Sequence, residues 1–170
     1  MAIPAYMTII GATQNHITAG ASSEKSVGTT RQGDRLDEIM VQSFKHDVII
    51  ATDPQSGQST GKRLNHPVVI SKVFDKTSPL LQEALSSGER LWVEIKWYRD
   101  SPIGQEHYFT TTLEEAIVLT VKDYMLDCQD PVHSHSTHMQ EVHLGFRKIT
   151  WTHEACGTSS VYNWDAPKTA

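Results

Sequence analysis

The sequence contains little of what a disulfide-stabilised or membrane-spanning protein needs. Only two cysteines occur among 170 residues, Cys128 and Cys156, and they do not form a C-x-x-C pair. No run approaches the roughly 18 apolar residues that a transmembrane helix requires. Small secreted domains depend on several disulfides. We therefore expect a reduced fold with two free thiols and no membrane insertion.

Charge of one sign does not dominate the chain either. The sequence has 15 Lys and Arg against 20 Asp and Glu, which gives a formal charge of -5. Binding to nucleic acid requires a basic face, so nucleic acid is not an expected partner. The N-terminal stretch MAIPAYMTII has no basic residue and is interrupted by Pro4, which does not fit a secretory signal peptide. The protein is therefore expected to fold in the cytoplasm.

Most of the sequence consists of strand-like segments. RLWVEIKWY is the clearest, because apolar side chains occupy every second position. A change of phase near Lys148 predicts a β-bulge, which bends a strand. The predicted fold is mainly antiparallel β, a barrel or a sandwich, in one domain spanning residues 1–170. The predicted strands cover residues 5–13, 37–50, 66–74, 90–98, 107–125 and 139–151.

One segment, TSPLLQEALSSGE, departs from the strand pattern and predicts a short amphipathic helix. Thr77 or Ser78 is the expected N-cap, Pro79 suits the first helical position, and Gly88 follows as a stop. We expect this helix to cover a sheet edge or the end of a barrel. Three stretches are expected to be weakly structured: residues 18–33, an extended loop at about 53–65, and a C-terminal tail at about 157–170.

The stretch DPQSGQSTGKR, residues 53–63, resembles two functional motifs without meeting the needs of either. Its G-x-S-x-G places Ser59 where a hydrolase nucleophile would stand, but that motif requires a helix directly after the serine, and turn and strand residues follow here. A phosphate-binding loop requires four residues between its glycines, then Lys and Ser or Thr. Here three residues separate the glycines, and Arg63 follows Lys62. No catalytic residue, nucleotide site or cofactor is therefore predicted.

Histidines and aromatic residues offer two further candidate sites. Four histidines lie between residues 133 and 143, a spacing at which imidazoles could hold zinc or nickel. A polar, flexible stretch seldom preorganises a metal site, so a surface loop without a physiological metal is the preferred interpretation. Tryptophan and tyrosine lie mostly on predicted strands and are expected in the core. Trp164 is the exception, and we expect it to anchor the tail on a surface.

Longer stretches of the sequence together resemble one known family. They include MAIPAYMTI at the start, DEIMVQSFKH, DPQSGQSTGKR, DKTSPLLQEAL, WYRDS, QEHYFTTTLEEA and HMQEVHLGFRKITWTHE, with GTSSVYNW near the end. Nearly the whole chain, in order, is similar to the haemolysin-coregulated protein family, Hcp. No single short motif carries the resemblance, which is why it outweighs the G-x-S-x-G match.

The resemblance implies a tail-tube protein of the bacterial type VI secretion system, an antiparallel β-barrel with one short helix like those of phage tail tubes. Such proteins associate as homohexameric rings. The rings stack into a hollow tube inside a contractile sheath, with a spike protein at the tip. Contraction ejects the tube, so the protein would be cytoplasmic first and then secreted without a signal peptide. Sheath proteins, the spike and small effector proteins in the lumen are the implied partners, besides the protein itself.

The resemblance also assigns the loop at about 53–65 to contacts with neighbouring subunits or rings. Its chemistry suits them, because Gly and Pro shape turns and Lys62 and Arg63 can pair with carboxylates. Small residues near the helix end and in the tail would let stacked rings approach closely. The contact-loop candidates are Asp53, Gln55, Gly57, Ser59, Thr60, Gly61, Lys62 and Arg63; the ring-stacking candidates are Ser86, Ser87, Gly88, Gly157, Ser159 and Ser160.

Two other functions are left open by the sequence. A serine hydrolase acting through Ser59 would react with a fluorophosphonate probe, and Ser59→Ala would abolish the label. A monomeric secreted effector or binding module with a tube-like barrel would sediment as a single subunit, whereas a tube protein would form annular particles. The alternation of side chains along a strand does not show which of its two faces would line the tube. The sequence also does not identify the cargo that the tube would hold.

Overall fold

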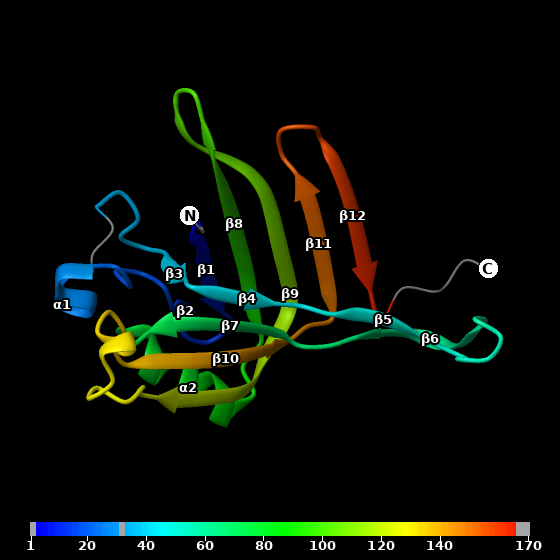
Figure 1. Ribbon diagram of the computed structural model, residues 1–170, viewed down its shortest axis with the longest axis horizontal. Coiled ribbons are helices and arrows are strands. Elements are labelled where there is room, and N and C mark those ends of the chain that lie inside the picture. Colours follow the sequence, from blue (N-terminus) through cyan, green and yellow to red (C-terminus); the bar gives the residue numbers. More distant parts are fainter. Residues whose placement is uncertain (1–2, 31–32, 166–170) are drawn as a thin grey trace.

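The protein is built mainly from antiparallel strands, as the computed structural model shows for residues 3–30 and 33–165 (Figure 1). In a 10-stranded sheet, seven strands are neighbours in the order β2-β1-β8-β9-β10-β7-β4, while β3 pairs with β1, β11 with β9, and β12 with β11. A separate two-stranded sheet consists of β5 and β6. The strands are β1 Ala5–Gly11, β2 Asn15–His16, β3 Ile39–Val41, β4 Ser43–Lys45, β5 Val48–Thr52, β6 Ser59–Asn65, β7 Val68–Val73, β8 Leu91–Ser101, β9 Gly104–Tyr124, β10 Met139–Gly145, β11 Lys148–His153 and β12 Thr158–Asn163.

The long strand β9 connects the two layers of the fold. Residues 104–116 of β9 pair with β8. On its other edge, residues 109–114 pair with β11, and residues 117–124, the C-terminal part, pair with β10. Between these parts the register with β8 shifts, and Glu115 adopts a left-handed φ of 49°. Such a bulge bends a strand. The β8–β9 and β11–β12 hairpins therefore stand at an angle to β7 and β10 (Figure 1).

The predicted β-bulge near Lys148 is wrong. β10 ends at Gly145 and a new strand, β11, begins at Lys148. Because β10 and β11 pair with different parts of β9, the chain crosses from one layer to the other at this point. The change of phase in the sequence therefore marks a change of layer. A register shift does occur upstream, between His143 and Leu144.

The strand predicted at residues 37–50 is divided into three. β3 pairs with β1, β4 pairs with β7, and the backbone N–H of Gln42 between them donates to the Ser71 carbonyl. Within the described residues the paired strands form an open path, so hydrogen bonds do not close them into a cylinder. The structure thus establishes a mainly β fold with a helix and leaves the predicted barrel as a proposal.

The predicted helix is present as α2, Thr77–Ser87. Its N-cap is Lys76 rather than Thr77 or Ser78, and the carboxylate of the preceding residue, Asp75, accepts the hydrogen bond of the Thr77 N–H at 2.8 Å. Gly88 ends the helix with a left-handed φ of 65°, as predicted. Leu81 and Ala84 are fully buried and hold the helix against the sheet.

Three stretches predicted to be weakly structured contain regular elements. The first has the one-turn helix α1, Glu24–Val27, and a 3₁₀ turn, Gly28–Thr30, while its residues 31–32 lie outside the described chain. β6 occupies residues 59–65 of the predicted loop, which leaves a turn at 53–58. β12 occupies residues 158–163 of the predicted tail, whose residues 166–170 are likewise not described. Cross-strand pairing with β5 and β11 holds these polar segments in place.

The core lies between the sheet and α2, with partial cover from aromatic rings. Tryptophans predicted to be core residues are only partly buried, including Trp97 and Trp151. Aliphatic side chains fill the interior instead, and each fully buried one stabilises the fold by about 1.5–3 kcal/mol. The largest of them are Met7, Ile9, Ile17, Ile39, Ile70, Leu81, Leu91, Ile95, Leu113, Leu144 and Ile149.

Candidate assembly surface

The β5–β6 hairpin, residues 48–65, projects from the body of the protein as an arm (Figure 1). Every residue of β5 is exposed, and in β6 only Arg63 and Asn65 are partly covered. An isolated two-stranded hairpin is marginally stable in water. The outer half of the arm is therefore held mainly by its own turn and cross-strand pairs.

Asp53 shapes the turn at the tip of the arm. Its carboxylate accepts hydrogen bonds from the Gln55 N–H at 3.0 Å and from Ser56 Oγ at 2.7 Å. These bonds, the one from Gln55 first, lower the pKa of Asp53 below its ordinary value. Gly57 adopts a φ of 67°, which favours glycine. The predicted contact residues Asp53, Gln55 and Gly57 thus share one ordered turn.

Exposed apolar side chains line the inner part of the arm. Ile49 and Leu64 are cross-strand partners, each 48% exposed, and Ile50 is 53% exposed. Contiguous exposed apolar residues mark interaction sites more often than chance. The sequence interpretation named the polar residues of this segment and missed these apolar ones. The sequence feature that could have revealed them is the run VIIA, in which apolar and polar residues do not alternate, so that the apolar side chains cannot all lie on one buried face.

The base of the arm is fastened to the β11–β12 hairpin by cation–π and ring contacts. Arg63 Cζ lies 4.1 Å from the Tyr162 ring centroid and 5.5 Å from that of Trp151. The His46 ring stacks on Trp151 with a centroid separation of 6.2 Å. Burial lowers the pKa of His46, and the charge of Arg63 acts in the same direction. Arg63, predicted as a carboxylate partner, therefore contacts aromatic rings within its own chain.

Ser59 does not occupy a nucleophile elbow. It is the first residue of β6, and strand, not helix, follows it. Its hydroxyl donates to the Gly61 carbonyl at 3.3 Å. No histidine ring is hydrogen-bonded to Ser59 in the described part of the chain. The G-x-S-x-G match therefore lacks the geometry of a serine hydrolase.

The other candidate sites are similarly modest. His133 lies in the 3₁₀ turn Pro131–His133, with Nδ1 3.8 Å from Asp130 Oδ2. Over residues 3–30 and 33–165, no three His, Cys, Asp or Glu side chains are placed to hold a metal ion. Cys128 and Cys156 are free and exposed. Among the same residues, no helix is long and apolar enough to cross a membrane.

The ring-stacking candidates fall into two separate groups. Ser86, Ser87 and Gly88 are exposed at the C-terminal end of α2. Gly157 lies in the turn between β11 and β12 with a φ of 69°, and Ser159 and Ser160 are exposed on β12 rather than in a loose tail. In Figure 1 the helix lies at the bottom of the molecule and the β11–β12 turn at the top.

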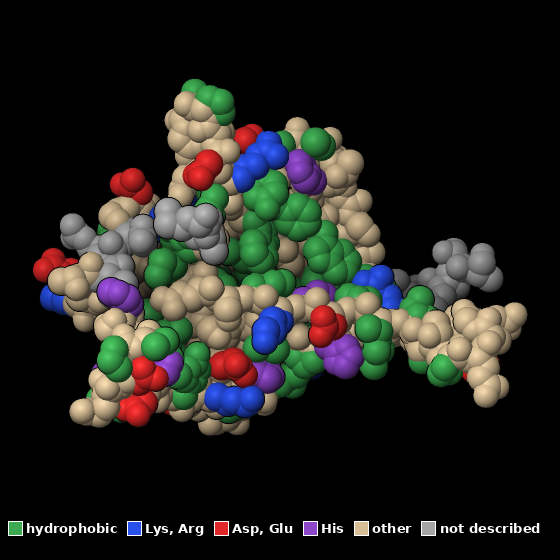
Figure 2. All heavy atoms as spheres, in the orientation of Figure 1, with side chains coloured by type: hydrophobic (Ala, Val, Ile, Leu, Met, Phe, Trp, Pro, Cys, Tyr) green, Lys and Arg blue, Asp and Glu red, His purple; other side chains and the backbone are tan. Residues whose placement is uncertain are grey.

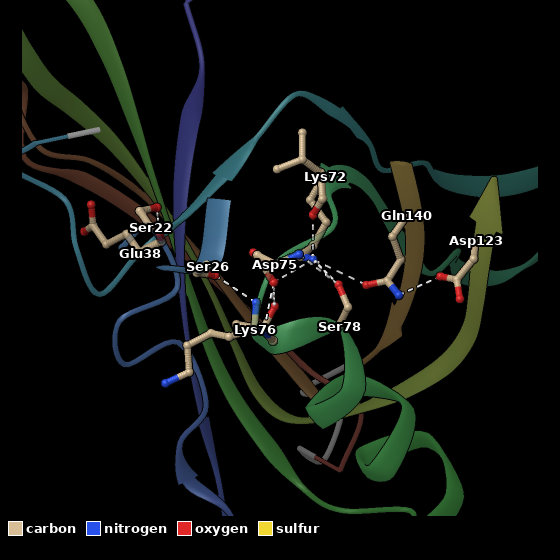
Figure 3. A network of polar contacts seen from close by, with 11 residues as sticks. Ser22, Ser26, Glu38, Lys72, Asp75, Lys76, Ser78, Asp123 and Gln140 are labelled. Atoms are coloured by element: carbon tan, nitrogen blue, oxygen red, sulfur yellow. Dashed lines mark hydrogen bonds and ion pairs between the residues drawn. The ribbon is translucent and has the colours of Figure 1, made fainter. Parts of the chain in front are cut away.

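A buried polar network ties α2 to the sheet (Figure 3). Lys72 is fully buried, and its Nζ lies 3.0 Å from Asp75 Oδ1 and 3.0 Å from Ser78 Oγ. Gln140 continues the network to Asp123, to which its Nε2 donates at 2.7 Å. Burial lowers the pKa of Lys72, and the charge of Asp75 opposes that effect. This network was not predicted from the sequence. The feature that could have revealed it is the single lysine within the β-branched run of β7.

The sequence and the fold both match one family. The family model described as "Type VI secretion system effector, Hcp" matches residues 6–153. The chain belongs to the Hcp family. This membership identifies a type VI secretion protein of the effector or tube class, as the resemblance in the sequence predicts.

Individual Hcp relatives agree over nearly the full length. The "Major exported protein" of Pseudomonas aeruginosa is 60% identical over 169 residues, 98% of each chain. The solved structure of secreted protein Hcp3 from Pseudomonas aeruginosa is 53% identical, with a TM-score of 0.80 over 95% of this chain and 99% of that one. Another, "Crystal structure of Hcp protein", is 40% identical, with a TM-score of 0.91 over 96% and 100% of the two chains.

Proposed function

We propose that this Hcp protein is a structural subunit of the inner tube of a type VI secretion system. Copies associate as homohexameric rings, the rings stack into a hollow tube, and the tube leaves the cell when the sheath contracts. The protein acts as one tail-tube domain, residues 1–170, and carries no catalytic site. The relatives called "Major exported protein" and "Secreted protein Hcp3" support export of this chain as well.

The arm is the observation that carries this proposal. It projects from the body with Ile49, Ile50 and Leu64 each about half exposed. A hairpin of this kind is stabilised when its apolar side chains are buried against another surface. A neighbouring copy of the same chain supplies that surface in a ring, where each arm reaches the next subunit and the contact closes on itself.

The sheet edges support ring closure independently. Among the described strands β12 pairs only with β11, so its outer edge has unpaired backbone groups. An open edge is an aggregation hazard unless another strand pairs with it. In the ring this edge joins the sheet of a neighbour. Within each subunit, the pairing of β3 with β1 and of β4 with β7 supports a barrel in which residues 39–45 bridge the two ends of the sheet.

Stacking brings the two groups of small residues together. Ser86–Gly88 of one ring would meet Gly157–Ser160 of the next, because the groups lie at opposite ends of the molecule. The spike, the sheath and small effector proteins in the lumen are the further partners of such a tube. Cysteines at Ser87 and Ser159 are expected to crosslink between rings in assembled tubes, and their failure to do so would remove this assignment.

The ring is tested by sedimentation velocity and negative-stain microscopy of the purified chain. Wild-type protein is expected to sediment as a hexamer and to show annular particles. Ile49→Asp should shift the protein toward monomer, because it places a charge in the buried contact of the arm. Leu36→Asp is the matched control, since Leu36 is also 48% exposed but lies outside the arm. A lone subunit at every concentration, without annular particles, would refute the proposed function.

A further inference from the structure

The tip of the β8–β9 hairpin carries an isolated apolar side chain. Ile103 is 99% exposed, although the hairpin around it is ordered. Ser101 pairs with Gly104, and Ser101 Oγ donates to the Gly104 carbonyl at 2.8 Å. Figure 1 shows this tip projecting beyond the body, and Figure 2 shows hydrophobic side chains at its outermost end. The turn therefore holds Ile103 as a fixed apolar projection.

A shallow apolar hollow lies at the other end of the same strand. It has a volume of about 250 Å³. Ile10 and Trp92 are cross-strand partners on β1 and β8, and Ile10 is 42% exposed. Trp is among the residue types enriched in the central residues that carry most of the binding energy of protein interfaces. The hollow is lined by Ile10, Gly11, Ala12, Arg90, Leu91, Trp92 and Glu115.

We propose that Ile103 of one copy of the chain inserts into the Ile10–Trp92 hollow of a second copy. This inference rests on the proposed tube, because the contact would be one of those that stack its rings. β8 has 11 residues, and a strand rises about 3.3 Å per residue, so its two ends are about 35 Å apart. A contact between two different surfaces at opposite ends of a molecule is heterologous and repeats from copy to copy along that direction.

Charge complementarity favours a second copy as the occupant. Asp100, exposed on β8 next to the tip, would accompany Ile103 into the contact. Arg90, also exposed, stands at the wall of the hollow. Glu115 is also exposed at this wall, so the pairing that a head-to-tail contact would bring about is that of Asp100 with Arg90, beside the insertion of Ile103 into the hollow. In a ring the contact would recur once per subunit, so a weak contact at each position is sufficient for stable stacking.

Disulfide trapping tests the contact directly. The native cysteines are exposed, so Cys128→Ser and Cys156→Ser provide the background. Ile103→Cys combined with Ala12→Cys is expected to give crosslinked species between copies under mild oxidation, at high protein concentration. Each cysteine alone should give none of the ladder that the pair produces. Absence of crosslinking by the pair would overturn the contact.

Point variants separate stacking from ring formation. Ile103→Asp is expected to leave annular particles intact and to reduce the fraction of rings found in stacks by at least about tenfold, because every subunit of the ring loses its weak contact at once. Val132→Asp is the matched control, because Val132 is 82% exposed and lies on a different loop. Arg90→Asp should weaken stacking, and adding Asp100→Arg should restore it.

The outcomes distinguish the inference from the proposed function. If Ile103→Asp rings stack as wild-type rings do, the Ile103 contact is overturned while the tube stands. If Val132→Asp reduces stacking equally, the effect is not specific to Ile103, and the contact is overturned too. Wild-type protein that forms no rings refutes the proposed function. In that case the disulfide test alone decides the contact: crosslinking between positions 103 and 12 supports it, and absence of crosslinking overturns it.

Discussion

The guanidinium carbon of Arg63 lies 4.1 Å from the ring centroid of Tyr162, which joins the projecting arm to the open-edged strand β12. The two features that support ring assembly are thus fixed relative to each other within one subunit. Binding costs less when the contacting parts are already ordered. We infer that Arg63 sets the direction of the arm before a neighbour arrives.

Replacing Arg63 should loosen the arm. Arg63→Ala is expected to lower the free energy of unfolding by about 1 kcal/mol, the size of a cation–π contact at a partly exposed site. It should also speed proteolytic cleavage between residues 53 and 58 several-fold. Arg63→Lys should be intermediate, because the ammonium group lacks a planar face to stack. The adjacent Lys62→Ala serves as control, and equal cleavage of both alanine variants would contradict the role given to Arg63.

The pH dependence of the arm is expected to depend on His46. Its ring contacts Trp151 and Phe146, and the nearby charged or titratable groups are Asp47, Arg63 and His66. Burial lowers the pKa of His46, so below its ordinary value of 6.5 the unfolded chain binds a proton more readily than the folded one. The stabilising contribution of this site is therefore complete above pH 6.5 and lost as the pH falls through the folded-state pKa.

His46→Phe keeps a ring in place but removes the titration. The variant should lose less unfolding free energy than wild type between about pH 7.5 and about pH 5, measured by urea unfolding at each pH. His135→Phe, at an exposed position on the loop after β9, should retain the wild-type dependence. Parallel pH curves for wild type and His46→Phe would show that this site does not contribute.

Alternation of apolar and polar residues within a segment predicts a strand well, but it does not identify the strand with which that segment pairs. The strand at 90–98 and the helix stop at Gly88 follow from local pattern and are confirmed. Local pattern predicts a loop and a tail at β6 and β12, because STGKRLN and TSSVYN are polar. Their strand conformation comes from cross-strand pairing, which depends on residues distant in sequence or on turn geometry. The exposure of Ile49 or Ile103 is likewise decided by which surfaces the fold leaves uncovered.

The buried Lys72–Asp75 pair should show strong coupling. The two side chains are 0% and 3% exposed, so removing either charge leaves the other buried and unpaired. Lys72→Met is expected to lower the free energy of unfolding by about 3–5 kcal/mol. Adding Asp75→Asn should recover much of that loss, since no charge then remains in the pair. Additive losses in chemical denaturation of the two single variants and the double variant would contradict this coupling.

Glu89 organises the turn after β1 and is expected to make the fold sensitive to acid. Its carboxylate accepts the N–H groups of Thr13 at 2.6 Å and Gln14 at 2.7 Å, and the Gln14 side-chain amide at 2.7 Å. Burial raises the pKa of Glu89, but the bonds from Gln14 and Thr13 together outweigh it, so the net pKa is below its ordinary value. The stability it provides is present above that ordinary value and is lost as the pH falls through the folded-state pKa.

Glu89→Gln should therefore lower the free energy of unfolding by about 1–3 kcal/mol near neutral pH, because an amide nitrogen would face the Gln14 donor. The difference from wild type should shrink in acid. Gly11→Ala tests the same site from the other side, since its added Cβ would clash with Glu89 Oε1. We expect Gly11→Ala to displace the carboxylate and to cost much less stability when Glu89→Ala is already present. Equal costs in both backgrounds, measured by urea unfolding, would show that Glu89 and Gly11 are not coupled.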